Sequence, residues 1–290
     1  MSAALARELF GCTFRNPLLL AAGTAGFGRE LDGAVDWRRM GGIVTKAVSL
    51  APRLGNRPPR VAEFAGGMMN AVGLANPGLA AVQARELPWL AAEAGNTRVM
   101  VNVVGFVEDE YVAVIEGLDD ADIITAYELN LSCPNTHAGG LEFGADTASV
   151  ARVIAACRRV TRRAIVAKLS PALPDLAGMA MAARDAGADG VSVVNTMPGL
   201  MQHVDGTPRL GNRFGGISGP TLLAVGTLAV SRILERTGGM VVIGTGGVRS
   251  ADDVRQYLRV GASLVAIGTG MMADPHLPGR VLDQLERHDG

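Results

Sequence analysis

The chain has 290 residues, 48% of them hydrophobic, with 38 glycines and a formal net charge of −1, a composition that suits a folded α/β protein and argues against disorder and nucleic-acid binding. No apolar run reaches the ~18 residues of a membrane span, and the start lacks the basic and long apolar regions of a secretory signal. Cys12, Cys133 and Cys157 are too few and too scattered for a disulfide framework or a metal site, so we expect a reducing cytoplasm.

Apolar runs in the first half of the chain predict a short strand or hairpin and then four short buried strands. The first strand or hairpin covers 9–14, and the four others cover 18–22, 42–46, 98–102 and 126–131. Helical periodicity is expected over 79–94 and 108–118. A segment rich in Pro and Gly, from 51 to about 77, is expected to be largely irregular, and a loop of this length inside a compact domain is usually functional.

The second half continues the alternation of strands and helices. Strands are predicted at 164–168 and 190–195, and the runs 240–247 and 264–270 each predict a strand that leads into a glycine turn. Helices are predicted at 147–160, 175–186, 222–236, 250–259 and 277–286. Ser250 caps one of these helices, with Asp253 three residues later as an acidic variant of the capping box. A second long loop is expected over 196–219.

Eight short apolar strands separated by helices indicate a buried parallel sheet. The length and the strand count favour an α/β fold of the (β/α)8 TIM-barrel type over a doubly wound sheet. A short N-terminal strand or hairpin and long active-site loops complete this prediction. No linker or shift in composition divides the chain, so residues 1–290 are predicted to form a single domain.

Polar residues stand at the ends of the predicted strands, where the catalytic loops of such barrels open. They are Lys46, Asn102, Asn130, Lys168 and Asn195. Two of the 27 basic residues are lysine and the other 25 are arginine, so arginine is the general surface cation of this chain. Both lysines could stand on the surface by chance, but their strand-end positions favour sites that require a compact ammonium.

The stretch 128–136 reads Glu-Leu-Asn-Leu-Ser-Cys-Pro-Asn-Thr. Pro134 disfavours a helical conformation at Cys133, so the strand is expected to open into a loop. The residues expected at its mouth are Asn130, Ser132, Cys133 and Asn135. A lone free cysteine is more often a small buried apolar residue. Polar neighbours and the strand-end position favour a reactive thiol here.

Glycine turns follow the last two strands, at 244–247 and 268–270, and the glycine-rich stretch 215–220 precedes a helix. Backbone N–H groups at such positions bind phosphate, and barrels place this site after their last strands. Neither turn fits Gly-x-Gly-x-x-Gly, the Rossmann fingerprint; in the first turn the sixth position, counted from Gly244, is Arg249. A phosphorylated cofactor is therefore predicted, and amide-rich walls with a lysine suit a flavin mononucleotide.

Along nearly its whole length the sequence resembles the class 1 dihydroorotate dehydrogenases. The motifs that carry the resemblance are Thr-Lys-Ala at 45–47, Asn-Ala-Val-Gly-Leu at 70–74, Asn-Leu-Ser-Cys-Pro-Asn at 130–135, Val-Asn-Thr at 194–196, Ser-Gly-Pro at 218–220, and both Gly-Thr-Gly turns. Cys133 stands where class 2 enzymes have a serine base. Asn195-Thr196 and the 215–220 stretch are most similar to subclass 1B, the catalytic subunit of an NAD-linked complex.

The resemblance implies one FMN per chain, with Cys133 as the general base in the oxidation of dihydroorotate to orotate. Cofactor contacts are implied for Ala22, Lys46, Ala47, Asn102, Asn130, Lys168, Val194, Gly219, Gly246, Gly247, Gly268 and Thr269. Substrate contacts are implied for Lys46, Asn70, Ala71, Val72, Gly73, Leu74, Asn130, Asn135, Asn195 and Thr196. Relatives often have serine where Ala22 stands, so a side-chain hydrogen bond to the flavin is lost there.

By the same resemblance we expect a homodimer that forms a heterotetramer with a partner subunit carrying FAD and a 2Fe–2S cluster, which passes electrons to NAD. The alternatives are a fumarate-linked enzyme of class 1A, another FMN barrel acting on a related pyrimidine, and a barrel that binds its ligand without turnover. Intact Cys133 and both lysines argue against the last of these.

Overall fold

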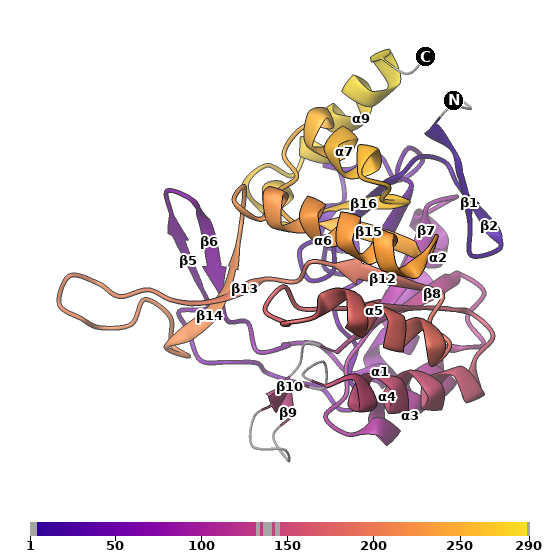
Figure 1. Ribbon diagram of the computed structural model, residues 1–290, viewed down its shortest axis with the longest axis horizontal. Coiled ribbons are helices and arrows are strands. Elements are labelled where there is room, and N and C mark those ends of the chain that lie inside the picture. The colour runs from indigo at the N-terminus through magenta and orange to yellow at the C-terminus, as the bar shows by residue number, and fades with distance from the viewer. Residues whose placement is uncertain (1–4, 132–133, 136–140, 143–145, 289–290) are drawn as a thin grey trace.

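The computed structural model describes residues 5–131, 134–135, 141–142 and 146–288. In that part of the chain a closed barrel of eight parallel strands forms the centre (Figure 1). In order around the ring the strands are β3 (Leu18–Leu20), β4 (Gly42–Val44), β7 (Arg98–Val103), β8 (Ile124–Asn130), β11 (Ala164–Lys168), β12 (Gly190–Val193), β15 (Val241–Thr245) and β16 (Leu264–Ile267). The predicted TIM barrel is confirmed.

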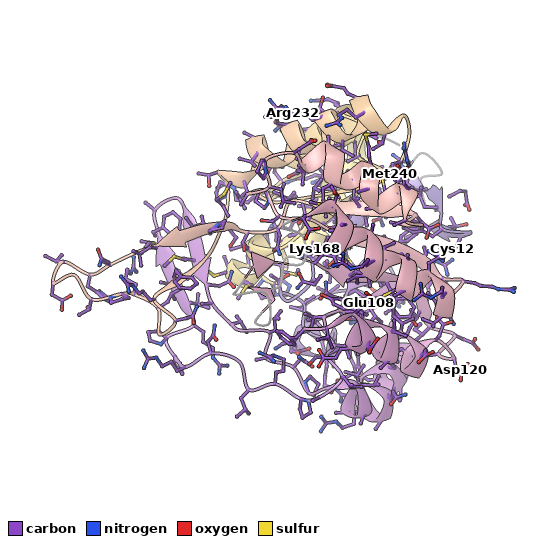
Figure 2. All side chains as sticks on the ribbon, turned by 60° about the horizontal axis from the view of Figure 1, so that its bottom comes forward. Cys12, Glu108, Asp120, Lys168, Arg232 and Met240 are labelled. Atoms are coloured by element: carbon purple, nitrogen blue, oxygen red, sulfur yellow. The ribbon has the colours of Figure 1, made fainter. Side chains whose placement is uncertain are left out.

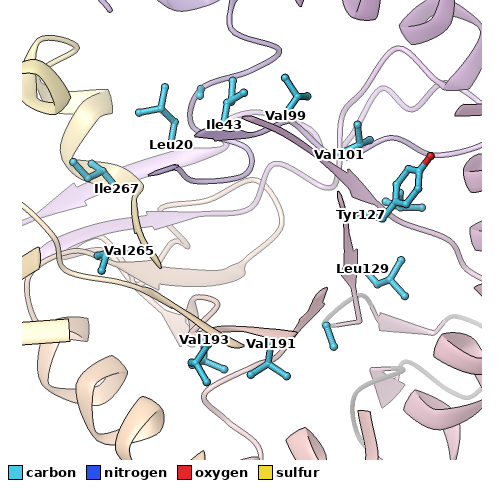
Figure 3. Packing of buried hydrophobic residues seen from close by; sticks show 14 of the residues in the cluster. Leu20, Ile43, Val99, Val101, Tyr127, Leu129, Val191, Val193, Val265 and Ile267 are labelled. Carbon is cyan, nitrogen blue, oxygen red and sulfur yellow. The ribbon is translucent and has the colours of Figure 1, made fainter. Parts of the chain in front are cut away.

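Each barrel strand places its side chains alternately in two apolar environments. Leu20 and Ile43, for example, point outward and pack beneath the helices, as the ring of side chains in Figure 3 shows. Leu19 and Val44 belong to a second cluster that fills the barrel interior. Because both faces are buried, the strands read in the sequence as continuous apolar runs without alternation.

Helices surround the barrel and lie close to the predicted ranges. They are α1 (Leu79–Ala81), α2 (Leu87–Glu93), α3 (Glu108–Leu118), α4 (Thr147–Val160), α5 (Leu176–Asp185), α6 (Leu222–Thr237), α7 (Ala251–Arg259), α8 (Thr269–Ala273) and α9 (Leu277–His288), with a short 3-10 helix, η2 (Arg29–Leu31). None of the helices in the described ranges is long and apolar enough to cross a membrane.

The region 79–94, predicted as one helix, is interrupted by a π-helical segment, η3 (Val82–Glu86). Pro88 follows it and has no backbone N–H, so the regular hydrogen-bond ladder cannot continue through this position. The predicted strands 18–22, 42–46 and 190–195 also end two residues earlier than expected. The regular pairing of β3, β4 and β12 stops two residues before Ala22, Lys46 and Asn195.

A hairpin of β1 (Arg7–Leu9) and β2 (Cys12–Phe14) precedes the barrel, as predicted. Its two connecting residues, Phe10 and Gly11, both have positive φ, the pattern of the tight turns that suit β-hairpins. Phe14 is fully buried and packs on the interior cluster, so the hairpin closes the amino-terminal end of the barrel.

An arm of four antiparallel strands projects from the barrel (Figure 1). Its strand order is β13 (Met197–Leu200), β14 (Phe214–Ser218), β6 (Gly67–Asn70) and β5 (Val61–Phe64). The segment 51–77, expected to be largely irregular, contains the paired strands β5 and β6, and the loop predicted over 196–219 contains β13 and β14. The two segments stabilise each other by pairing across about half the chain, and composition alone does not reveal such pairing.

Candidate functional site

The polar residues predicted at the strand ends lie at one end of the barrel. Asn130 and Lys168 are the last residues of β8 and β11 and are paired in register. Asn102 is next to last in β7, and its carbonyl accepts a backbone hydrogen bond from the segment that follows β4 and Lys46. The backbone N–H of Asn195 donates to the residue after Lys168. These contacts bring the five predicted residues to the carboxyl ends of neighbouring strands.

Lys168 lies inside the barrel rather than on its surface, with 8% of its area exposed. In Figure 2 it lies well within the outline of the molecule, whereas Asp120 lies at the edge. Its Nζ is 3.5 Å from Oε1 of Glu128, a carboxylate that is 2% exposed. The same Oε1 accepts a hydrogen bond of 2.6 Å from Nδ2 of Asn102. A cation and an amide thus compensate the burial of one carboxylate.

Glu128 was not among the predicted site residues, although it opens the stretch that the sequence analysis singled out. It stands two residues before Asn130, and alternate residues of a strand face the same side. That spacing places it in the barrel interior beneath the strand end. An acidic residue at an interior position of an apolar strand is the sequence signal that would have identified it.

Lys46 differs from Lys168 in its surroundings. Its backbone N–H donates to the carbonyl of Gly26 at 2.7 Å, which fixes the segment after β4. Within the described residues its ammonium group has no carboxylate within salt-bridge distance and forms no hydrogen bond. The half-buried Lys46 therefore offers an unneutralised positive charge at the same end of the barrel where the charge of Lys168 is balanced.

Asn130 presents a buried acceptor that nothing in the described part of the chain satisfies. Its backbone carbonyl accepts a hydrogen bond of 2.9 Å from the hydroxyl of Tyr111, which anchors the end of β8. Its side-chain Oδ1 is buried without a hydrogen-bond partner. Leaving a buried acceptor unpaired costs about 1–3 kcal/mol, so this atom is suited to accept a hydrogen bond from a ligand.

The 70–74 loop, predicted to hold substrate, is fixed by asparagine side chains on both sides. Nδ2 of Asn56 donates to the carbonyl of Ala71 at 3.0 Å. The buried Asn76 donates from Nδ2 to the carbonyl of Leu74 at 2.8 Å. Leu74 has a φ of 58°, which a leucine rarely adopts, and the two anchors hold the backbone in this conformation. Neither asparagine anchor was identified from the sequence.

The arm and the loop after β12 bring three further predicted residues together. Asn70 ends β6 and pairs with Gly216 of β14, whose carbonyl accepts from Asn70 Nδ2 at 3.4 Å. A Cβ atom on Gly216 would overlap the side chain of Thr196, so the glycine permits this close approach. The N–H of Thr196 in turn donates to Oδ1 of Asn195 at 2.9 Å. Asn70, Asn195 and Thr196 are therefore neighbours.

The glycine turns also converge. Gly219, Gly246 and Gly247 have φ values of 128°, 112° and 77°, which residues with a side chain rarely adopt. A Cβ atom on Gly247 would lie 2.5 Å from a backbone nitrogen of α6, so the turn after β15 packs against the start of that helix. The hydroxyl of Thr269 donates to the hydroxyl of Ser218 at 2.7 Å, which joins the loop after β16 to the end of β14.

Tyr257 holds the glycine turn at 244–247 through hydrogen bonds. Its hydroxyl lies 2.9 Å from the carbonyl oxygens of both Thr245 and Gly246, and burial raises its pKa, so the group stays protonated and donates. A Cβ atom on Gly244 or Gly226 would overlap the tyrosine side chain, so both glycines make room for it. No local sequence pattern marks Tyr257, because its partners come from other elements.

Four predicted cofactor residues lie one to three positions after the ends of barrel strands. Ala22, Ala47, Val194 and Gly268 come after β3, β4, β12 and β16 respectively. Ala47 and Val194 are buried, and the N–H of Val194 donates to the carbonyl of Thr245. A Cβ atom on Gly268 would meet nothing closer than 3.6 Å, so the backbone there is open on one side.

The predicted base, Cys133, lies outside the described residues. Asn135 belongs to β9 (Pro134–Asn135), which pairs with β10 (Leu141–Glu142) in an antiparallel ladder. The roles predicted for Cys133 and for the side chain of Asn135 remain predictions from the sequence.

Comparison with known proteins agrees with the resemblance that the motifs indicate. A family model for dihydroorotate dehydrogenase matches residues 4–288. A relative from Bacillus pumilus (strain SAFR-032), named the catalytic subunit of dihydroorotate dehydrogenase B (NAD(+)), is 40% identical over 279 residues, covering 96% of this chain and 89% of its own. A relative of the same name from Pelobacter propionicus is 40% identical over 281 residues, covering 97% of this chain and 91% of its own.

Among solved structures, dihydroorotate dehydrogenase from Eimeria tenella in complex with ferulenol has a TM-score of 0.80 to this chain. The alignment covers 97% of this chain and 83% of the other, with 24% sequence identity. At that identity the likeness supports the barrel fold and carries no information about individual site residues.

Proposed function

The chain belongs to the dihydroorotate dehydrogenase family, and we propose that it is the catalytic subunit of an NAD-linked enzyme that oxidises (S)-dihydroorotate to orotate in pyrimidine biosynthesis. The observation that carries the proposal is the placement of both lysines of the chain, with Asn102, Asn130 and Asn195, at the carboxyl ends of the barrel strands. This is the end at which TIM barrels place their chemistry.

FMN is the cofactor that fits these residues. A flavin ring carries an N–H group that could donate to the buried Oδ1 of Asn130, which has no partner within the described residues. Lys168, at the end of the neighbouring strand, would bring a cation to the same site. The converging glycine turns offer backbone N–H groups for a phosphate. The proposed contacts are Ala22, Lys46, Ala47, Asn102, Asn130, Lys168, Val194, Gly219, Gly246, Gly247, Gly268 and Thr269.

For dihydroorotate we propose contacts from residues that the arm and the strand ends bring together. The free charge of Lys46 suits the carboxylate of the substrate, and asparagine amides can pair with the donors and acceptors of its ring. The proposed set is Lys46, Asn70, Ala71, Val72, Gly73, Leu74, Asn130, Asn135, Asn195 and Thr196. The fixed 70–74 loop would hold the ring without reordering on binding.

Oxidation of dihydroorotate removes a proton from C5 and a hydride from C6, and a C5–C6 double bond forms. When bound, FMN supplies the acceptor for the hydride. We assign the proton to the thiolate of Cys133, which becomes a thiol. The ordinary pKa of a cysteine is ~8.5, so polar neighbours or a cation must favour the thiolate at neutral pH. We assign the substrate carboxylate to Lys46, whose positive charge would hold the ring during the loss of both hydrogens.

Flavin absorption tests this function directly. The purified protein should be yellow, and anaerobic addition of dihydroorotate should bleach the flavin band, whereas dihydrouracil, which lacks the carboxylate, should leave it unchanged at the same concentration. A protein that purifies without flavin and does not bind added FMN would contradict the proposed cofactor. Bleaching by dihydrouracil alone would assign the barrel to another pyrimidine.

The electrons must then leave the chain, and its sequence has neither a Rossmann fingerprint nor a cysteine cluster for iron–sulfur. We therefore propose a partner subunit carrying FAD and a 2Fe–2S cluster, joined to a homodimer of this chain in the cytoplasm. Exposed apolar side chains on the arm support a protein contact there, namely Val61, Leu200, Val204 and Phe214.

Acceptor assays test the partner separately from the oxidation itself. The isolated chain should reduce dyes or oxygen with dihydroorotate but should not reduce NAD, and NAD activity should arise when an FAD and iron–sulfur subunit is added. Turnover of the isolated chain with fumarate at the rate of flavin reduction would instead support an enzyme of class 1A.

A further inference from the structure

Glu128 is a buried carboxylate to which the proposed mechanism gives no role. Its Oε1 lies 3.5 Å from Nζ of Lys168 and 2.6 Å from Nδ2 of Asn102. At 2% exposure it is as buried as the apolar residues of the barrel interior. Replacing such a buried pair by apolar residues is often neutral or stabilising, so a role in stability alone explains this charge poorly.

Glu128 lies two residues before the end of its strand, β8. It pairs with Asn102 of β7 on one side and with Val166 of β11 on the other. Lys168 and Asn130 are paired with each other two residues further along their strands. A ligand at the mouth of the barrel therefore meets those strand-end residues, and the two contacts of Glu128 link it to that ligand through Lys168 and Asn102.

We propose that Glu128 is a positioning residue that balances the charge of Lys168 and orients the amide of Asn102, and that it thereby keeps the reduction potential of bound flavin low. The inference rests on the proposed FMN site and adds to it a residue that does not touch the cofactor.

The effect on Asn102 follows from hydrogen-bond chemistry. An ionised carboxylate accepts hydrogen bonds and cannot donate them, so the amide of Asn102 must direct its Nδ2 toward Glu128. Its Oδ1 is then left to accept from a donor at the mouth of the barrel. A glutamine at 128 can both donate and accept, so the amide of Asn102 would lose this fixed orientation.

The effect on Lys168 is electrostatic. Fixed charges act strongly in a site that excludes water, and a cation favours the form of a ligand that carries negative charge. Reduced flavin is more negative than oxidised flavin. Because Glu128 already balances Lys168, the reduced form gains less from this lysine. Without the carboxylate, the reduced ring would become the counter-charge of Lys168 and would bind more tightly than the oxidised ring.

Glu128→Gln in the FMN-loaded protein tests the inference. We expect the dissociation constant of oxidised FMN, divided by that of reduced FMN, to rise at least tenfold over wild type. For a two-electron couple this corresponds to an upward shift of about 30 mV in the reduction potential. The potential is measured by anaerobic equilibration with a reference dye, without dihydroorotate, so the readout does not depend on turnover.

Asp119→Asn is a matched control. Asp119 also holds a partly buried ion pair, with its Oδ1 3.4 Å from Nε of Arg163, and it accepts from the hydroxyl of Tyr127 on the outer side of β8. It lies beyond the amino end of this strand, away from the proposed flavin site. The control should lower thermal stability and leave the flavin potential at the wild-type value.

An unchanged potential in folded, FMN-bound Glu128→Gln would overturn the inference and leave Glu128 a structural residue. If that variant does not fold, Glu128→Asp keeps the charge but draws it back by one methylene, and it should shift the potential in the same direction by a smaller amount. No shift in Glu128→Asp would also overturn the inference. A wild-type protein that binds no FMN would instead contradict the proposed function.

Discussion

The two ends of the barrel interior are made by the same strands but have opposite chemistry. On β7 the interior residue Met100 is followed two positions later by Asn102, and on β11 Val166 is followed by Lys168. The lower positions belong to the apolar interior cluster that Phe14 covers, and the upper ones carry amides and charges. Along each of these strands the apolar layer and the polar layer are thus two residues apart, a rise of about 6.6 Å.

This difference shows how the barrel combines a stable interior with a polar site. The apolar layer stabilises the fold through burial alone. The polar layer carries a buried ion pair and an unpaired acceptor, which cost stability unless a ligand completes them. Substitutions in the lower layer should therefore change stability more than ligand binding, and those in the upper layer should do the reverse.

The largest effect is expected from Cys133→Ala, the substitution of the proposed base. This variant should keep FMN but slow flavin reduction by dihydroorotate ~10²–10⁴-fold, the usual contribution of a positioned base. Stopped-flow absorption at neutral pH measures that rate. A near-normal rate of flavin reduction would show that Cys133 does not take the proton, and the polar end of the barrel would then lack its proposed base.

Thiol labelling gives an independent check on the same residue. Burial raises the pKa of Cys157 to about 12 and also raises the pKa of Cys12 in the amino-terminal hairpin, so both should stay protonated at neutral pH. Only thiolates react well with iodoacetamide. Labelling of native protein at pH 7 should therefore fall mainly on Cys133, and bound orotate should protect it.

The neighbours Met100 and Asn102 compare the two layers on a single strand. Met100 is fully buried, and Met100→Ala should lower the free energy of unfolding by about 2–5 kcal/mol through the cavity it leaves. FMN affinity of the folded variant should stay near wild type. Asn102→Ala should instead weaken FMN binding about tenfold, or ~1.4 kcal/mol. Urea unfolding and flavin titration of both variants test this, and equal losses of FMN affinity would contradict the separation.

The lower layer was easier to predict from the sequence than the upper one. The runs that contain Leu19, Val44 and Met100 identified barrel strands, because burial on both faces leaves a continuous apolar signal. The strand-end lysines and asparagines were also found, since a polar residue after such a run is conspicuous. Glu128 was missed because it stands within an apolar strand rather than after its end.

The arm could not be predicted for a different reason. Asn70 pairs with Gly216, and pairing between such distant segments leaves no periodic mark in either of them. Their glycines and prolines instead indicated loops. The anchors Asn56 and Asn76 escaped notice for the same reason, because each acts on a backbone carbonyl that only the fold brings near.

The two lysines test whether the upper layer needs lysine or only positive charge. Lys168→Arg places a larger planar cation against Glu128 in the barrel interior, where there is little room, and should weaken FMN binding by about tenfold, or ~1.4 kcal/mol. Lys46→Arg should raise the KM for dihydroorotate by a similar factor. Wild-type FMN affinity and turnover in both variants would refute the inference that these two sites require lysine rather than arginine.

The smallest effect is expected from Ser250, which lies at the same end of the barrel but on its outer ring of helices. Ser250 accepts a hydrogen bond from the N–H of Asp253 at 3.2 Å, and the carboxylate of Asp253 accepts from the serine hydroxyl at 2.9 Å. This reciprocal cap begins α7, so Ser250→Ala should cost about 1 kcal/mol of unfolding free energy.

Ser250→Thr, which keeps the cap, is the matched control. Because the cap lies on the outer ring, both variants should retain wild-type flavin potential and turnover. If Ser250→Ala altered the flavin potential or the turnover while Ser250→Thr did not, residues outside the barrel interior would also contribute to the chemistry.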